Sequence, residues 1–105
     1  MSTVEISRSI LNAVRTGRVY IGSKSTLKSV MFRRVRLVIL AENTPKDLAD
    51  SISYYCKLAG IPIYIYKGSS IELGRVCGKP FPVSALGIRD PGDSNILELV
   101  SMELG

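Results

Sequence analysis

The segment Gly22-Ser23-Lys24-Ser25-Thr26 combines residue types that can hold an anion. Gly22 lets another backbone approach closely, and a helix that begins after it offers free N–H groups. Lys24 and, one helical turn further on, Lys28 add positive charge. The segment therefore predicts a site for a phosphate group.

A nucleotide-binding P-loop, GxxxxGK[ST], is a rival interpretation of the same segment. Gly17 and Gly22 have the required spacing, but Ser23 intervenes before Lys24. The residues between the glycines, 18–21, have the pattern of a strand rather than of a phosphate cradle. The P-loop hypothesis is therefore disfavoured, whereas a plain strand-to-helix turn stays open.

Glu42-Asn43-Thr44-Pro45 directly follows an apolar run that predicts a buried strand. Ligands of open α/β sheets bind at the carboxyl ends of strands. The amide of Asn43 can read a base edge, and Glu42 can accept from amino or imino groups. Helix capping is the alternative, with Thr44 as N-cap and Pro45 at the first helical position, but capping needs neither Glu42 nor Asn43.

Phe81 stands between two prolines in the predicted loop 78–82, beside Lys79. An exposed ring there could pack on a nucleic-acid base, and such stacking contributes roughly 1–3 kcal/mol per base. The alternative is that Phe81 folds back onto the sheet.

Charge is distributed unevenly along the 105 residues, whose net charge is +5. No acidic residue occurs from Ile6 to Ala41, whereas Asp90 to Gly105 contains acidic residues but no lysine or arginine. The resulting excess of positive charge in residues 6–41 favours an anionic partner, although a solvated basic face is an alternative.

The chain has no histidine, which argues against a zinc site and removes the commonest general base. We therefore predict neither an enzyme nor a metal or other cofactor.

Composition also indicates the class of protein and its location. With 46% hydrophobic and 22% charged residues the chain is globular. It has no apolar run near the ~20 residues of a membrane span and no signal-peptide pattern, so we expect a cytoplasmic protein without membrane contact. Cys56 and Cys77 lack CxxC spacing and should be reduced, buried hydrophobes.

Apolar periodicity alternates between helices and strands along the whole chain. Capping boxes at Ser2-x-x-Glu5 and Ser69-x-x-Glu72 begin two of the helices. The predicted helices cover about 3–16, a segment after Gly22, a segment from Thr44 to Gly60, a short segment through Val76, and the end of the chain after Gly92. The predicted strands are 18–21, 36–41, 62–66 and 83–88. One α/β domain over 1–105, with a four-stranded mixed sheet between helices, follows from this order.

Five longer stretches carry a family likeness: IGSKSTLKSV (21–30), RLVILAENTP (36–45), YYCKLAGIPIY (54–64), ELGRVCGKPFPVSALGI (72–88) and DPGDSNIL (90–97). With them the chain resembles the archaeal and eukaryotic ribosomal protein L30e family, within the wider L7Ae group. That group binds kink-turns, which are sharply bent RNAs with an asymmetric internal loop. The resemblance implies a three-layer α/β/α sandwich and, because the chain lacks long basic tails, favours an archaeal source.

The resemblance also implies an RNA interface made by three loops. Carried over by position, its residues are Gly22, Ser23, Lys24, Lys28, Glu42, Asn43, Gly78, Lys79, Phe81 and Val83. The expected role is a structural constituent of the large ribosomal subunit that binds ribosomal RNA and neighbouring ribosomal proteins, and is monomeric when free. A free kink-turn protein in RNA processing or autoregulation is the second hypothesis. A small-molecule-binding enzyme and a protein-interaction module, the latter using the tyrosines and the acidic C-terminal helix, remain as rivals.

Overall fold

The computed structural model describes residues 3–104, with side-chain surroundings for 5–101. A single sheet has the strand order β1-β4-β2-β3. Its strands are β1 (Arg18–Ile21), β2 (Leu37–Ala41), β3 (Ile63–Tyr66) and β4 (Ala85–Asp90). Strand β4 is antiparallel to both β1 and β2, and β2 is parallel to β3. The prediction of a four-stranded mixed sheet is therefore confirmed.

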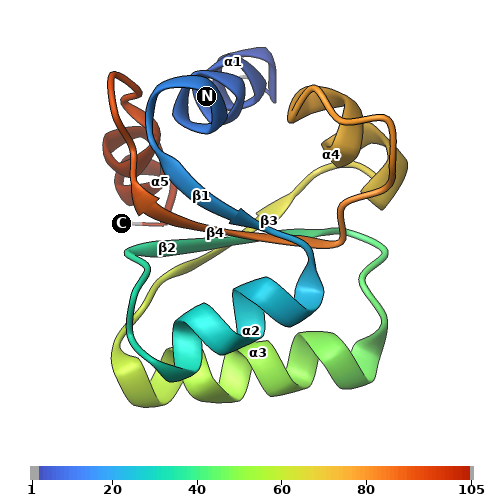
Figure 1. The fold of residues 1–105 in the computed structure, drawn as a ribbon, viewed down its shortest axis with the longest axis vertical. Helices are drawn as coiled ribbons and strands as arrows, with labels where there is room; N and C mark the ends of the chain where they lie inside the picture. Colours follow the sequence, from blue (N-terminus) through green and yellow to red (C-terminus); the bar gives the residue numbers. More distant parts are fainter. Residues whose placement is uncertain (1–2, 105) are drawn as a thin grey trace.

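Helices cover both faces of this sheet (Figure 1). They are α1 (Thr3–Thr16), α2 (Ser23–Met31), α3 (Lys46–Ala59), α4 (Ser70–Val76) and α5 (Ile96–Leu104). Figure 1 shows α2 and α3 below the sheet and α1, α4 and α5 above it. The molecule is thus the three-layer α/β/α sandwich that the resemblance implied.

Strand β2 explains why its apolar run is continuous rather than alternating. All its residues are buried, and successive side chains enter opposite layers. Leu37, Ile39 and Ala41 pack in the core below α1, α4 and α5, whereas Val38 and Leu40 pack against α2 and α3. A strand covered on both faces needs apolar residues at every position.

The predicted strands differ from the observed ones by one or two residues at several ends, and two of the boundary differences bear on the candidate site. Helix α3 begins at Lys46, and Thr44 is not its N-cap, because the Thr44 Oγ1 donates to the carbonyls of Ala41 (2.7 Å) and Ser84 (2.9 Å) instead. Strand β4 begins at Ala85, so Val83 precedes the sheet. In both cases a contact between loops distant in sequence determines the local structure.

Capping at α4 agrees with the sequence, since the Oγ of Ser69 accepts from the backbone N of Glu72 at 3.3 Å. The capping box predicted at Ser2 lies outside the described residues. Gly60 ends α3 in the left-handed conformation, with φ of 71°, as the sequence indicated.

The turn before α5 fixes that helix to α1. The backbone N of Asp93 donates to the Oγ1 of Thr16 at 3.0 Å, and the Ser94 Oγ donates to the Ser9 carbonyl at 2.6 Å. The Ser9 Oγ in turn donates to the Oδ1 of Asn95 at 2.8 Å. The C-terminal segment thereby completes the layer above the sheet, away from the loops considered next.

Candidate nucleic-acid interface

Strand directions bring three loops to one end of the sheet. The first loop, which is Gly22 together with the first turn of α2 (22–25), follows β1, the second loop (42–45) follows β2, and the third loop (78–84) precedes β4. Ile21 pairs with Leu86, and Leu40 pairs with Ala85. Because β4 is antiparallel to both neighbours, its amino end meets the carboxyl ends of β1 and β2. The loops that sequence reasoning selected separately therefore converge.

Hydrogen bonds hold the second and third loops together. The Ser84 carbonyl accepts both the Thr44 hydroxyl, at 2.9 Å, and the backbone N of Ala41, at 2.8 Å. The backbone N of Val83 donates to the Ser70 carbonyl at 2.9 Å. These bonds fix the backbone of both loops, so their exposed side chains start from a defined framework.

The first loop leaves the sheet at Gly22. Its N donates to the Ala85 carbonyl at 3.0 Å, and its φ of 102° is a conformation that other residues rarely adopt. Helix α2 begins directly afterwards without a side-chain cap. Its first N–H groups, from Ser23 onwards, thus lack intrahelical partners. Lys24 and Lys28 are exposed one turn apart on the same helix, so this end of α2 can hold an anion.

Asn43 has a fixed orientation in the second loop. Its Oδ1 accepts from the backbone N of Ser70, the first residue of α4, at 2.8 Å. Since a backbone N can only donate, the amide oxygen must face it, and the Nδ2 donors point elsewhere. Asn43 and Glu42 are both exposed, and the backbone N of Glu42 donates to the Gly68 carbonyl at 3.0 Å. The pair therefore offers donors and an acceptor side by side.

The third loop presents Phe81 on the surface. The ring is 50% exposed, so the alternative in which it folds back onto the sheet is wrong. Gly74 makes this position possible, because a Cβ there would overlap the Phe81 carbonyl. Gly78, with φ of 74°, turns the chain out of α4, and the backbone N of Lys79 donates to the Gly74 carbonyl at 2.9 Å. A shallow pocket of about 330 Å³ results, lined by Ile71, Arg75, Lys79, Pro80, Phe81 and Pro82.

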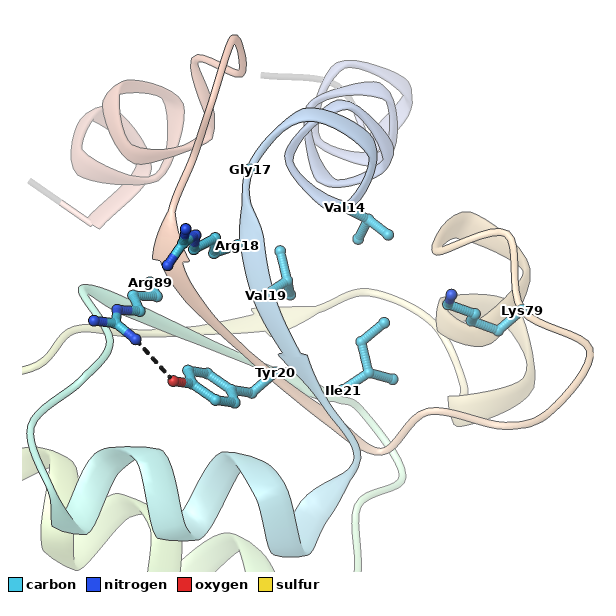
Figure 2. Close-up of a pocket in the computed structure, with 8 residues that line it drawn as sticks. All are labelled: Val14, Gly17, Arg18, Val19, Tyr20, Ile21, Lys79 and Arg89. Atoms are coloured by element: carbon cyan, nitrogen blue, oxygen red, sulfur yellow. Dashed lines mark hydrogen bonds between the residues drawn. The ribbon is translucent and has the colours of Figure 1, made fainter.

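Lys79 also faces the sheet edge. It lines a second pocket, of about 470 Å³, that runs along β1 (Figure 2). Figure 2 places the Lys79 side chain across from Ile21, the last residue before the first loop. Lys79 thus places a positive charge beside the end of β1 that leads into the first loop.

Val83 is the predicted contact that the structure removes. Its side chain is 1% exposed and packs in the core with α1, α4 and α5. Only its backbone takes part in the loop framework, so the side chain cannot pack against a base. An apolar residue at the end of a loop gives no sequence signal that separates these two environments.

Sequence reasoning also missed the residues that support the loops. Gly74 lies within α4, and Ile71 and Arg75 flank Phe81 from the same helix face. Their spacing of four residues is a helical signal, but only the folded chain places that face beside the third loop. Within the described residues no group of three or more His, Cys, Asp or Glu side chains could hold a metal, and no described helix is long and apolar enough to cross a membrane.

Comparison with known proteins agrees with this geometry. The profile of the ribosomal protein L7Ae/L30e/S12e/Gadd45 family matches residues 5–98, and the chain belongs to this family. It is 54% identical to the large ribosomal subunit protein eL30 of Methanothermobacter thermautotrophicus, over 92% of this chain and 99% of that one. It is 51% identical to the eL30 of Methanocaldococcus jannaschii, over 97% and 93% of the two chains. These relatives carry the name of a ribosomal subunit protein, which supports the prediction that the chain is not an enzyme.

Proposed function

We propose that this protein is a structural constituent of the large ribosomal subunit and binds a kink-turn-like internal loop of ribosomal RNA. Family membership and the names of the archaeal relatives support the ribosomal role. The observation that carries the RNA site is the bond from the backbone N of Ser70 to the Asn43 Oδ1, at 2.8 Å. It ties the second loop to the helix that leads into the third, and it leaves the Nδ2 donors of the exposed Asn43 out of this bond.

Phosphate contacts come from the first loop. The exposed Lys24 and Lys28 and the free N–H groups at the start of α2 attract backbone phosphates without reading sequence. Gly22 and Ser23 allow the RNA backbone to approach this helix end closely, because Gly22 lacks a side chain. Lys79, from the third loop, adds charge beside the first.

Base contacts come from the second and third loops. The Asn43 amide donates to an exposed base edge, while Glu42 accepts from an amino or imino group. The exposed Phe81 packs against a base that has left the stack, which is the usual mode in bent or looped RNA. Gly78 positions this loop. Each contact needs unstacked bases, so a continuous duplex satisfies few of them.

In this proposal residues 1–105 form one RNA-binding domain that needs no cofactor and is monomeric when free. Its partners are large-subunit ribosomal RNA and neighbouring ribosomal proteins, and its location is that of the ribosome, the cytoplasm. The second candidate, a free kink-turn protein in RNA processing or autoregulation, uses the same site. Sedimentation of cell extracts separates the two, since a ribosomal constituent travels with large subunits.

Titration into a kink-turn RNA and into a matched plain duplex, across a salt series, tests the proposal. We expect a preference for the kink-turn at every salt concentration. The affinity for the kink-turn should fall with a log–log slope of about −0.7 to −0.9 for each phosphate contact. Equal affinity for the two RNAs would overturn shape readout.

A further inference from the structure

A second concentration of cations, with an exposed aromatic ring, extends along α2 from the first loop, at Ser25, to the turn after the helix, at Arg34. A groove of about 200 Å³ between α2 and β1 is lined by Tyr20, Ser25, Lys28, Ser29, Phe32 and Arg34. Arg89 lies against it and donates from Nη1 to the Tyr20 hydroxyl at 3.4 Å. In Figure 2 the side chains of Tyr20 and Arg89, from β1 and β4, meet at this bond beside the sheet, with α2 below them. We name this surface the α2–β1 groove.

The groove carries one sign of charge. Its lining and Arg89 supply three cations, Lys28, Arg34 and Arg89, and no carboxylate. Arg89 and Arg34 lower the pKa of the Tyr20 phenol, and the largest cause is the hydrogen bond from Arg89. The phenol therefore lies in a positive electrostatic environment, of the kind that attracts phosphate.

The aromatic component is Phe32, which is 60% exposed. The Arg34 guanidinium carbon lies 5.4 Å from the centre of its ring, within the range of a cation–π contact. The turn after α2 produces this pair. Arg33 has a left-handed φ of 54°, and the backbone N of Arg34 donates to the Ser29 carbonyl at 2.8 Å. An exposed ring with a paired guanidinium is a platform on which a base can stack.

Lys28 connects the groove to the three loops. Lys24, Lys28 and Phe32 are spaced four residues apart, so they follow one face of α2. A polyanion bound at the start of α2 can therefore continue along the helix, past Lys28, to Arg34 and Arg89. A protein partner would need matched carboxylates, whereas RNA supplies phosphates and a stacking base together.

From this arrangement we infer that the α2–β1 groove is a second RNA-binding surface, which holds the phosphates of a single-stranded segment and stacks one of its bases on Phe32. The inference extends the proposed function, because it takes RNA as the partner and adds a contact outside the three loops. The segment is either a strand that continues from the kink-turn or a separate strand.

The experiment uses the full chain and two RNA arms. In the first, a kink-turn RNA with a single-stranded tail, placed on each strand in turn, is compared with the tail-less RNA. In the second, a fluorescent single-stranded oligonucleotide of mixed sequence is added to protein already saturated with tail-less kink-turn RNA. Tighter binding of a tailed RNA identifies a continuing strand, and binding of the free oligonucleotide identifies a separate one. Failure of both arms overturns the inference.

Variants assign the binding to the groove. Phe32→Ala should weaken the tail or oligonucleotide contact about five-fold or more with little change in salt slope. Arg89→Ala should reduce the magnitude of that slope by about 0.7, as for one single-stranded phosphate. The matched controls are Leu58→Ala, which removes a side chain that is also 60% exposed, and Arg8→Ala, which removes an exposed arginine of α1. Equal losses in variants and controls would contradict the assignment.

The two proposals fail independently. If wild-type protein shows no preference for a kink-turn over a duplex, the proposed function fails, yet the oligonucleotide arm on protein without kink-turn RNA still tests the groove. If the preference holds and Phe32→Ala and Arg89→Ala bind the tailed RNA like wild type, only the groove is refuted.

Discussion

Asn43 offers a substitution that separates folding from RNA recognition. In the structure the backbone N of Ser70 donates to the Asn43 Oδ1 at 2.8 Å. Asn43→Asp keeps an oxygen that can accept this bond but replaces the Nδ2 donors by a second oxygen. Asn43→Ala removes both functions. Because Ser70 is the first residue of α4, loss of the acceptor resembles loss of a helix cap, which costs about 0.5–2 kcal/mol. A carboxylate at a helix start instead adds roughly 0.3–1 kcal/mol.

The expected results therefore diverge. Asn43→Ala should lower the free energy of unfolding by about 1 kcal/mol, whereas Asn43→Asp should leave it unchanged or raise it slightly. Both should lose the base contact, roughly 1–3 kcal/mol or about 5- to 150-fold in affinity for the kink-turn RNA. The negative charge that Asn43→Asp introduces should add to this loss, because it repels the RNA phosphates nearby.

Urea denaturation and calorimetric titration with kink-turn RNA measure the two quantities. Asn43→Asp binding as tightly as wild type would refute base readout by Nδ2. Asn43→Asp destabilised as strongly as Asn43→Ala would refute the assigned amide orientation. Neither outcome depends on the α2–β1 groove.

The first loop, the support of Phe81 and the buried thiols each give a further expected outcome. Lys24→Ala should weaken kink-turn and duplex binding alike and reduce the magnitude of the salt slope by about 0.7–0.9, as salt-series titrations will show. Gly74→Ala should displace the Phe81 carbonyl, so that the affinity for the kink-turn RNA falls. Overpacking costs about 1–3 kcal/mol and the higher helix propensity of alanine offsets ~1 kcal/mol, so the stability in urea should change little or decrease. Unchanged affinity together with higher stability would contradict the support of Phe81 by Gly74. Burial raises the pKa of the Cys56 and Cys77 thiols to about 11, so a thiol reagent should react slowly until the chain unfolds. Because these folded-state pKa values lie above the unfolded ones, the thiols' contribution to stability is present below pH 9 and is lost as the pH rises towards 11. Denaturation of the wild type and of a Cys56→Ala, Cys77→Ala double variant, carried out at a series of pH values, will measure this contribution.

The sequence predicted the architecture because its local signals agree with the tertiary environment. The apolar run of β2 lies between two helix layers, and Gly60 ends α3 in the conformation that glycine favours. Thr44 is the exception, since its hydroxyl has the chemistry of an N-cap but donates to the carbonyl of Ser84, 40 residues away. No local pattern contains that partner.

The residues of the candidate site were likewise only partly predictable from the sequence. Gly22, Lys24, Asn43 and Phe81 stand out because capping or core packing leaves them unexplained, and the structure exposes the last three at one end of the sheet. The burial of Val83 depends on how the third loop meets the helices above the sheet, which residue type alone cannot specify. The basic excess before Ala41 indicated an anionic partner, but the pairing of strands was needed to assemble the α2–β1 groove from it.

Backbone amide chemical shifts on addition of a kink-turn RNA test the central claim most directly. We predict that the largest changes occur together in residues 22–25, 42–45 and 78–82, and that a duplex of the same composition shifts them less. Changes concentrated in α3 or α5, with the three loops unaffected, would contradict it.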